Sequence, residues 1–261
     1  MKIKIFVGAL LVGFLAGCSF VPPSIKPQEL VVFAASSLTD AFSALEVAYE
    51  DRHEDVDVVL NFASSSQLAA QLNEGIAADV FASANPTQMH VVIEGGRIEA
   101  GTEKLFVSNR LVVITPTDNP ANITSLEDLA NKGVALVLAV EGVPVRQYTD
   151  QIVSRLPAEF QERIYANLVS EEDNVRQVSA KIALGEADAG VVYTSDVTPD
   201  IQGMVQQISI PDAQNVVATY PIAPWADTAN PALAQSFIYF VLSAEGQTIL
   251  AERGFGAPPN K

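Results

Sequence analysis

Short apolar segments alternate along the chain with segments of helical periodicity. The apolar segments are rich in Val, Ile and Phe, and they cover residues 30–34, 56–62, 79–82, 111–114, 134–140 and 190–193. Strands that alternate with helices are typical of βαβ units. The pattern therefore predicts an α/β fold with a mostly parallel sheet.

The intervening segments carry apolar stripes at helical spacing. One stripe runs from Leu38 to Tyr49, and a shorter one runs from Val175 to Ile182 and ends before Gly185. Both are typical of amphipathic helices that pack on a core. Further helices are predicted over residues 146–156, 231–242 and 244–253. These faces indicate packing and no particular chemistry.

The N-terminus has the layout of an export signal. Two lysines precede an apolar run from Ile5 to Gly17, with small residues before Cys18, so residues 1–17 predict a signal peptide. The run is too short to span a bilayer as a helix, which needs about 20 residues. Leu15-Ala16-Gly17-Cys18 resembles the bacterial lipobox, and Cys18 is the only cysteine. We therefore expect Cys18 to carry a lipid, with residues 18–28 as a tether; an incidental cysteine in an ordinary signal peptide is the alternative.

The charge balance limits the possible partners. Removal of residues 1–17 takes away Lys2 and Lys4 and no acid, which leaves 13 basic and 31 acidic residues and a formal net charge of −18. Nucleic acid and acidic membrane surfaces reward clustered Lys and Arg, so neither is expected as a partner. An anion bound by this chain must be held by local dipoles. The roughly 240 remaining residues predict one large lobe or two smaller ones.

Serines follow the first two predicted strands. The first strand leads into Ser36 and Ser37, and the second leads into Ser64, Ser65 and Ser66. Serine is a favoured N-cap residue, so the simplest role of each serine is to cap its own helix. Helix N-termini also present unpaired N–H groups that bind anions. Two such junctions at the carboxyl ends of adjacent strands would collect donors in one crevice, where open α/β sheets bind ligands.

Two later junctions have the same character without a serine. Pro144, in Val143-Pro144-Val145, stands near the start of a predicted helix, where its missing N–H costs little. Residues 171–175 precede the helix that ends near Gly185. A plain helix start explains both junctions equally well at this stage.

An enzyme is the competing function from another class. The sequence has no Gly-x-Ser-x-Gly elbow and no His-Glu-x-x-His motif. His53 and His90 are expected on the surface, and Ser179 and Lys181, two apart on a helix, face different directions. The acidic residues show no metal-ligand spacing. We therefore expect no enzymatic activity and no cofactor. A sensor ectodomain is a further alternative, but no second membrane span is present through which it could signal.

Six short motifs stand in a fixed order along the chain. They are Ala34-Ala35-Ser36-Ser37-Leu38-Thr39, Phe62-Ala63-Ser64-Ser65-Ser66, Ala78-Asp79-Val80-Phe81-Ala82-Ser83-Ala84, Val143-Pro144-Val145, Glu172-Asp173-Asn174-Val175-Arg176 and Val191-Val192-Tyr193-Thr194-Ser195-Asp196. Each is weak alone, whereas the ordered set is specific. In this order the motifs resemble those of the periplasmic molybdate-binding protein family, and the likeness runs from about Glu29 to Phe255.

The resemblance implies a type II periplasmic-binding-protein fold, with two α/β lobes and a ligand cleft between them. Lobe 1 would hold residues 29–110 and 220–261, and lobe 2 residues 111–219. The implied ligand is molybdate or tungstate, with sulfate, phosphate or another small anion as the alternative. The molybdenum would be bound only as its oxyanion, with no protein ligand on the metal. The implied partner is the membrane permease of an ABC importer, and the protein is expected to be a monomer.

The family's oxyanion contacts carry over to five positions. They are the hydroxyl and backbone N–H of Ser37 and of Ser65, the backbone N–H of Val145 and of Val175, and the phenol of Tyr193. The chain departs from the family pattern at Ser36 and Val145, where alanine is common, and at Arg146, where glycine is frequent. An arginine there is expected to alter the mouth of the cleft.

Overall fold

The computed structural model describes residues 27–259. The predicted signal peptide 1–17, Cys18 and the predicted tether up to residue 26 lie outside the described residues. Gln28, expected as the end of the tether, is already the first residue of a strand. Within residues 27–259, every helix is too short or too polar to cross a membrane.

Strands and helices alternate through most of the chain, which confirms the predicted α/β class. The strands are β1 (Gln28–Ala35), β2 (Val56–Ala63), β3 (Val80–Ala82), β4 (Lys104–Pro116), β5 (Leu136–Ala139), β6 (Leu168–Glu172), β7 (Ala189–Tyr193), β8 (Val205–Ser209) and β9 (Val217–Pro224). The helices are α1 (Thr39–Glu50), α2 (Ser65–Asn73), α3 (Pro86–Glu94), α4 (Pro144–Val153), α5 (Ala158–Ala166), α6 (Val175–Ala183), α7 (Pro231–Leu242) and α8 (Ala244–Glu252), with 3-10 turns η1 (Ser36–Leu38), η2 (Glu127–Ala130) and η3 (Thr194–Asp196).

The strands form a mixed sheet in the order β2-β1-β3-β9-β4-β7-β5-β6, and β8 pairs with β4. The pairs β1–β2, β1–β3, β5–β6 and β5–β7 are parallel, as the βαβ pattern predicts. β4 and β9 enter antiparallel to their neighbours. Because parallel strands end at the same edge, the junctions after β1 and β2 lie side by side, with Ala35 opposite Ala63.

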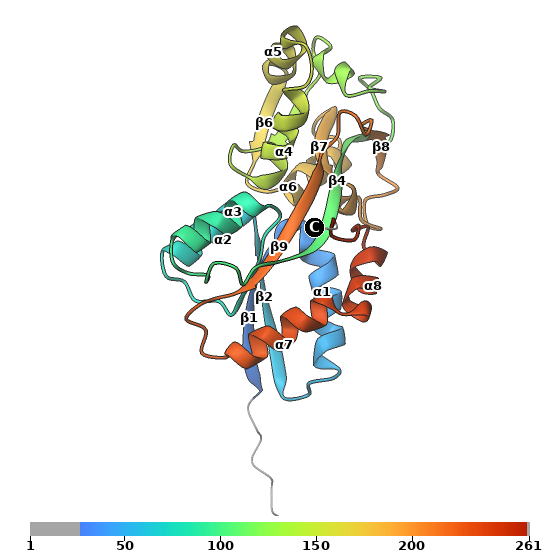
Figure 1. Ribbon diagram of the computed structural model, residues 1–261. Coiled ribbons are helices and arrows are strands. Elements are labelled where there is room, and N and C mark those ends of the chain that lie inside the picture. The colour runs from blue at the N-terminus through green and yellow to red at the C-terminus, as the bar shows by residue number, and fades with distance from the viewer. Residues whose placement is uncertain (1–26, 260–261) are drawn as a thin grey trace, which may run out of the picture.

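Two long strands connect the two halves of the molecule. β4 pairs with β9 as far as Arg110, and from Leu111 it pairs with β7 and β8. Figure 1 shows β4 and β9 running from the half that contains β1, α1 and α7 into the half that contains α4, α6 and β7. The proposed lobe boundary at residues 110 and 111 coincides with this change of partner. The assignment of residues 29–110 and 220–261 to one lobe and 111–219 to the other stays a proposal.

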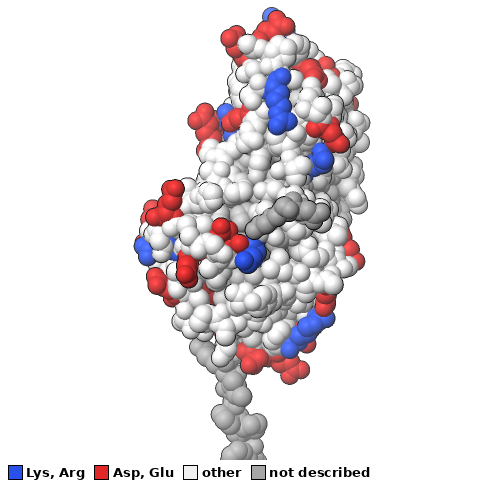
Figure 2. Space-filling model, viewed as in Figure 1, with Lys and Arg blue, Asp and Glu red and all other residues white. Residues whose placement is uncertain are grey.

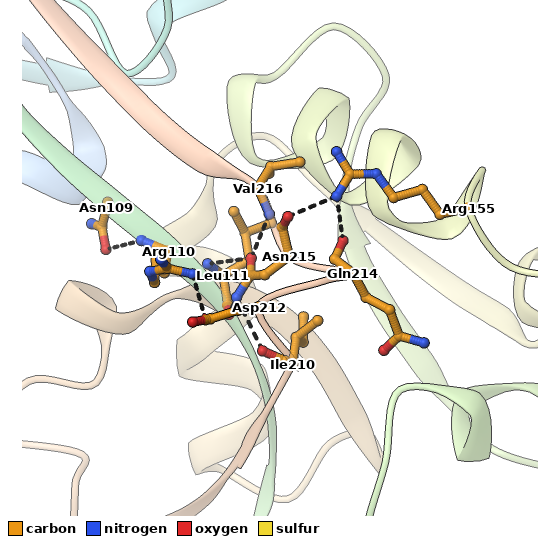
Figure 3. Close-up of polar contacts among 9 residues, drawn as sticks. All are labelled: Asn109, Arg110, Leu111, Arg155, Ile210, Asp212, Gln214, Asn215 and Val216. Carbon is orange, nitrogen blue, oxygen red and sulfur yellow. Dashed lines mark hydrogen bonds and ion pairs between the residues drawn. The ribbon is translucent and has the colours of Figure 1, made fainter. Parts of the chain in front are cut away.

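The buried Asn215 fixes the point at which β4 changes partner. Its side-chain amide accepts a hydrogen bond from the N–H of Leu111 at 3.3 Å and donates one to the carbonyl of Leu111 at 2.9 Å (Figure 3). Arg155 donates to the carbonyls of Gln214 and Asn215 at 2.8 and 2.7 Å, so the segment before β9 is held to the end of α4. Hydrogen bonds to β4 and to the end of α4 therefore hold the start of β9 where the chain passes between the two halves.

The surface matches the acidic composition. On the face seen in Figure 2, Lys and Arg lie in small separate groups among acidic side chains, without a continuous basic area. This face offers no cationic platform of the kind that binds nucleic acid.

Candidate functional site

All five residues expected to contact an oxyanion line one small pocket between the two halves. Its empty volume is about 190 Å³. So little space suits a small ion rather than a larger organic ligand. The lining residues are Ala35, Ser36, Ser37, Ser64, Ser65, Ala84, Val143, Pro144, Val145, Val175 and Tyr193, none of which carries a charge.

Ser37 reaches the pocket from the 3-10 turn that links β1 to α1. Neither the 3-10 turn η1 nor the helix α1 is capped by the side chain of Ser36 or Ser37. The buried Ser37 hydroxyl lies 3.1 Å from the phenol oxygen of Tyr220 on β9. Burial, first of all, raises the pKa of Tyr220 well above its usual value, so this phenol keeps its proton. When Tyr220 donates to Ser37, the Ser37 proton is left free to donate into the pocket.

The two serines at the start of α2 have different roles. Ser64 is the N-cap, and it forms a reciprocal capping box with Gln67. Ser65 is the first helical residue and does not cap the helix. Its hydroxyl oxygen accepts the N–H of Ala84 at 2.9 Å, which leaves its proton available to a ligand. The capping interpretation therefore holds for Ser64 and fails for Ser65.

The second half contributes the N-termini of α4 and α6. Val145 is the second residue of α4, whose N-cap Val143 provides no side-chain acceptor. Val175 is the first residue of α6, where the side chain of Asn174 accepts only the N–H of Gln177. Among the described residues, no backbone hydrogen bond uses the N–H of Val145 or of Val175. Both are among the orphan donors that a helix N-terminus offers to an anion.

Close packing sets the position of α6. Gly190 on β7 faces this helix, and a Cβ added there would lie 2.8 Å from Val178 and 3.1 Å from Ile182. A larger residue at this position would push α6, and with it the N–H of Val175, away from the sheet.

Tyr193 ends β7 and carries the clearest unmet polar group of the pocket. The residue is only 1% exposed, and its phenol oxygen has no hydrogen-bond partner among the described residues. Burial and the neighbouring Tyr220 raise the pKa of Tyr193 well above its usual value. The group is therefore a neutral O–H that can donate. Since buried polar groups are almost always paired, this hydroxyl indicates a missing acceptor.

Arg146 does not line this pocket, which corrects the expectation that it alters the cleft mouth. Its buried guanidinium pairs with Asp150 at 2.8 Å and Glu171 at 2.6 Å, and it lies over the ring of Tyr165. These groups surround a separate surface pocket on the second half. Arg146 therefore stabilises the packing of α4 against β6 and α5.

The other residues considered for chemistry lie away from the pocket. His53 stacks on Tyr49, and His90 is exposed on α3. Ser179 donates to the carbonyl of Arg176, while Lys181 pairs with Glu172 at 2.6 Å. No serine–lysine dyad forms between these two side chains.

Comparison with known proteins agrees with this geometry. Residues 30–256 match the family described as bacterial extracellular solute-binding protein. The chain is 38% identical over 259 residues to the molybdate-binding protein ModA of Mycobacterium tuberculosis, with 97% of this chain and 96% of that protein covered. It is 28% identical to YvgL of Bacillus subtilis, named a putative ABC transporter substrate-binding lipoprotein, with 98% of both chains covered.

Solved structures also include a substrate-binding protein that the chain resembles. The substrate-binding domain of a putative molybdenum ABC transporter from Clostridium difficile matches with a TM-score of 0.67 and 29% identity, over 88% of this chain and 99% of that chain. The expected two-lobe fold is confirmed by this likeness. The expectation that the chain is no enzyme is confirmed too, because its relatives are solute-binding transport proteins. The chain belongs to the family of bacterial extracellular solute-binding proteins, in the branch that resembles ModA.

Proposed function

We propose that this protein captures molybdate, or tungstate, between its two halves and delivers it to the membrane permease of an ABC importer. The ligand class is supported by the similarity to ModA over nearly the whole chain. The observation that carries the proposal is the buried Tyr193 hydroxyl, which has no acceptor among the described residues and borders a pocket without charged side chains. A small anion would supply that acceptor.

The proposed contacts are seven donors: two hydroxyls and two backbone N–H groups from Ser37 and Ser65, the N–H groups of Val145 and Val175, and the phenol of Tyr193. Charge-assisted hydrogen bonds of roughly 1.5 to 3 kcal/mol each amount to about 10 to 20 kcal/mol before dehydration and closure are subtracted. A micromolar to nanomolar complex needs only about 8 to 12 kcal/mol net. Binding without any Lys or Arg is therefore energetically sufficient, and no side chain needs to coordinate the metal.

The donor set also predicts which anions are refused. Phosphate keeps a proton at neutral pH, and that proton would face donors, at a cost of roughly 1 to 3 kcal/mol. Sulfate is fully deprotonated and is the closer competitor. Its shorter bonds to oxygen make it less able to reach donors on both halves at once.

Calorimetric titration of the purified mature chain with molybdate, tungstate, sulfate and phosphate tests the proposal. We expect saturable binding of molybdate and tungstate, weaker binding of sulfate and the weakest binding of phosphate. Phosphate binding as tight as that of molybdate would contradict the donor-only site. If sulfate binds more tightly than molybdate, the proposed ligand is wrong and sulfate, the alternative ligand, takes its place.

The proposal includes export and a lipid anchor at Cys18. The name of YvgL, a putative lipoprotein of similar length, supports the anchor. We also propose that the protein acts as a monomer. Size-exclusion chromatography with light scattering tests the oligomeric state, and a dimer mass would contradict it.

A further inference from the structure

One arginine joins the two halves of the molecule beside the pocket. Arg176 follows Val175 at the start of α6. Its Nη2 lies 2.7 Å from Oδ2 of Asp40, in the first turn of α1 on the other half. Its Nε lies 3.1 Å from Oδ1 of Asp196, in η3 on its own half. The guanidinium thus bridges a carboxylate of each half.

The two carboxylates differ in their surroundings. The side chain of Asp196 is fully buried, whereas those of Asp40 and Arg176 are 38% and 24% exposed. Asp40 and Arg176 also border a larger cavity, whose empty volume is about 1320 Å³ and which shares only Ser37 with the oxyanion pocket. Arg176 itself is not among the residues that line the oxyanion pocket. It therefore acts on a bound anion indirectly.

A second set of contacts between the halves is uncharged. Asn85, which caps α3, donates to the side chain of Gln147 on α4 at 2.7 Å. Gln88 donates to the carbonyl of Gly142 at 3.1 Å. The Asp40–Arg176 pair is thus the ionic contact between halves that adjoins the proposed Ser37 and Val175 donors.

We propose that Asp40 and Arg176 are positioning residues that hold the halves closed over the ligand. This inference takes the identity of the ligand from the proposed function, whereas the contact between Asp40 and Arg176 does not depend on it. When the halves separate, the Asp40–Arg176 pair must break because its members lie on different halves. The Arg176–Asp196 pair lies within one half and can persist. The energy of the first pair therefore favours only the closed state, and it slows ligand release.

The test replaces Asp40 by Asn, which keeps the size of the side chain and removes its charge. At low salt, we expect the molybdate dissociation rate to rise about two- to fivefold, as for a partly exposed ion pair. The association rate should change little. The difference between variant and parent should shrink at high salt, since salt screens exposed charges. Stopped-flow measurement of both rates at two salt concentrations provides the data.

Glu245→Gln is the matched control. It removes one acid from the exposed Arg52–Glu245 pair on a single half, in which Arg52 lies just after α1 and Glu245 lies in α8. This variant should leave both rates unchanged. Equal dissociation rates for Asp40→Asn and the parent, or an equal rise in both variants, would overturn the proposal.

A measurement without ligand separates this inference from the proposed function. Dyes on Glu94→Cys and Glu162→Cys, in a Cys18→Ser background, report the distance between exposed positions on α3 and α5. We expect Asp40→Asn to lower energy transfer in the ligand-free protein and molybdate to restore it. If the shift occurs but molybdate binds no variant, the proposed ligand is wrong and the positioning role stands. If molybdate binds and the ligand-free distance is unchanged, the positioning role is wrong.

Discussion

The substitution Tyr193→Phe should weaken ligand binding without destabilising the fold. The substitution deletes one hydroxyl and leaves the ring in place. In the folded chain that hydroxyl has no partner among the described residues, so its removal breaks no internal hydrogen bond. The same hydroxyl is one of the seven proposed donors to the oxyanion. The variant should therefore lose affinity without losing stability.

The two effects have different magnitudes. Loss of a charge-assisted hydrogen bond in a closed site should weaken molybdate by roughly 1.5 to 3 kcal/mol, or about ten- to a hundredfold. An unpaired buried hydroxyl costs roughly 1 to 3 kcal/mol, so its removal should leave the free energy of unfolding unchanged or raise it by up to that amount. For a chain of this size, each kcal/mol moves Tm by about 2 to 4 °C.

Tyr49→Phe provides the control. Tyr49 is as buried as Tyr193, but its hydroxyl donates to Ser236 at 2.9 Å between α1 and α7. This variant should lower the free energy of unfolding by about 1 kcal/mol and leave molybdate affinity unchanged. Calorimetric titration measures the affinities, and thermal unfolding of the ligand-free proteins measures the stabilities. Parental affinity in Tyr193→Phe, or a loss of stability equal to that of Tyr49→Phe, would refute the role assigned to Tyr193.

The remaining predictions concern the serines at the start of α2, the N–H of Val175, the buried Asp196 and the proposed anchor at Cys18. Ser64→Ala should cost about 1 kcal/mol of stability with little effect on binding, whereas Ser65→Ala should weaken molybdate about ten- to a hundredfold; unfolding and titration separate them. Val175→Pro should weaken binding at least tenfold while Val175→Ala should not, with circular dichroism as the folding control, because only proline removes the N–H. Burial raises the pKa of Asp196 to about 6, so the folded chain holds this proton to higher pH than the unfolded chain does. The free energy of unfolding, measured by urea unfolding, should therefore fall by about 1 to 3 kcal/mol as pH rises from 4 to 7. Asp196→Asn should lack this fall. Cys18→Ser should release the protein from the membrane fraction or stall its processing, and an unchanged distribution would remove the anchor.

The elements with strong periodicity were predictable from the sequence. The helix over residues 231–242 was predicted with the bounds that α7 has, and the apolar segments mark β1, β2, β3, β5, β7 and the second half of β4. β6 and β8 were missed because their positions are mostly exposed or half-buried: β6 has no fully buried residue, and β8 has only Val205. β9 was missed as well, although its centre is buried. Its antiparallel place between β3 and β4 is a long-range pairing that local pattern does not encode.

The sequence predicted the site in part as well. The motif order brought out the five proposed contact residues, all of which line the pocket, but composition gave no reason to prefer Ser65 over Ser64. That distinction depends on which residue is the N-cap, and Gln67, three residues after Ser64, is the signal that could have revealed it. Arg146 was misjudged because its direction depends on Asp150 and Glu171, and Glu171 lies 25 residues further along the chain, on β6.

The division of labour among serines and helix ends explains how an acidic protein can hold an anion. The proposed donors are neutral dipoles, and neighbouring groups hold three of them in place. Hydrogen bonds to Ala84 and Tyr220 hold the hydroxyls of Ser65 and Ser37, and the close approach of α6 to Gly190 holds the N–H of Val175. The nearby cation, Arg176, is neutralised by two carboxylates and so contributes little to the field in the pocket. Affinity then depends on how well the two halves align their donors, and a small opening weakens several hydrogen bonds together. A site built in this way can bind tightly when closed and release its ligand when opened, without an ion pair that must be broken at the ligand.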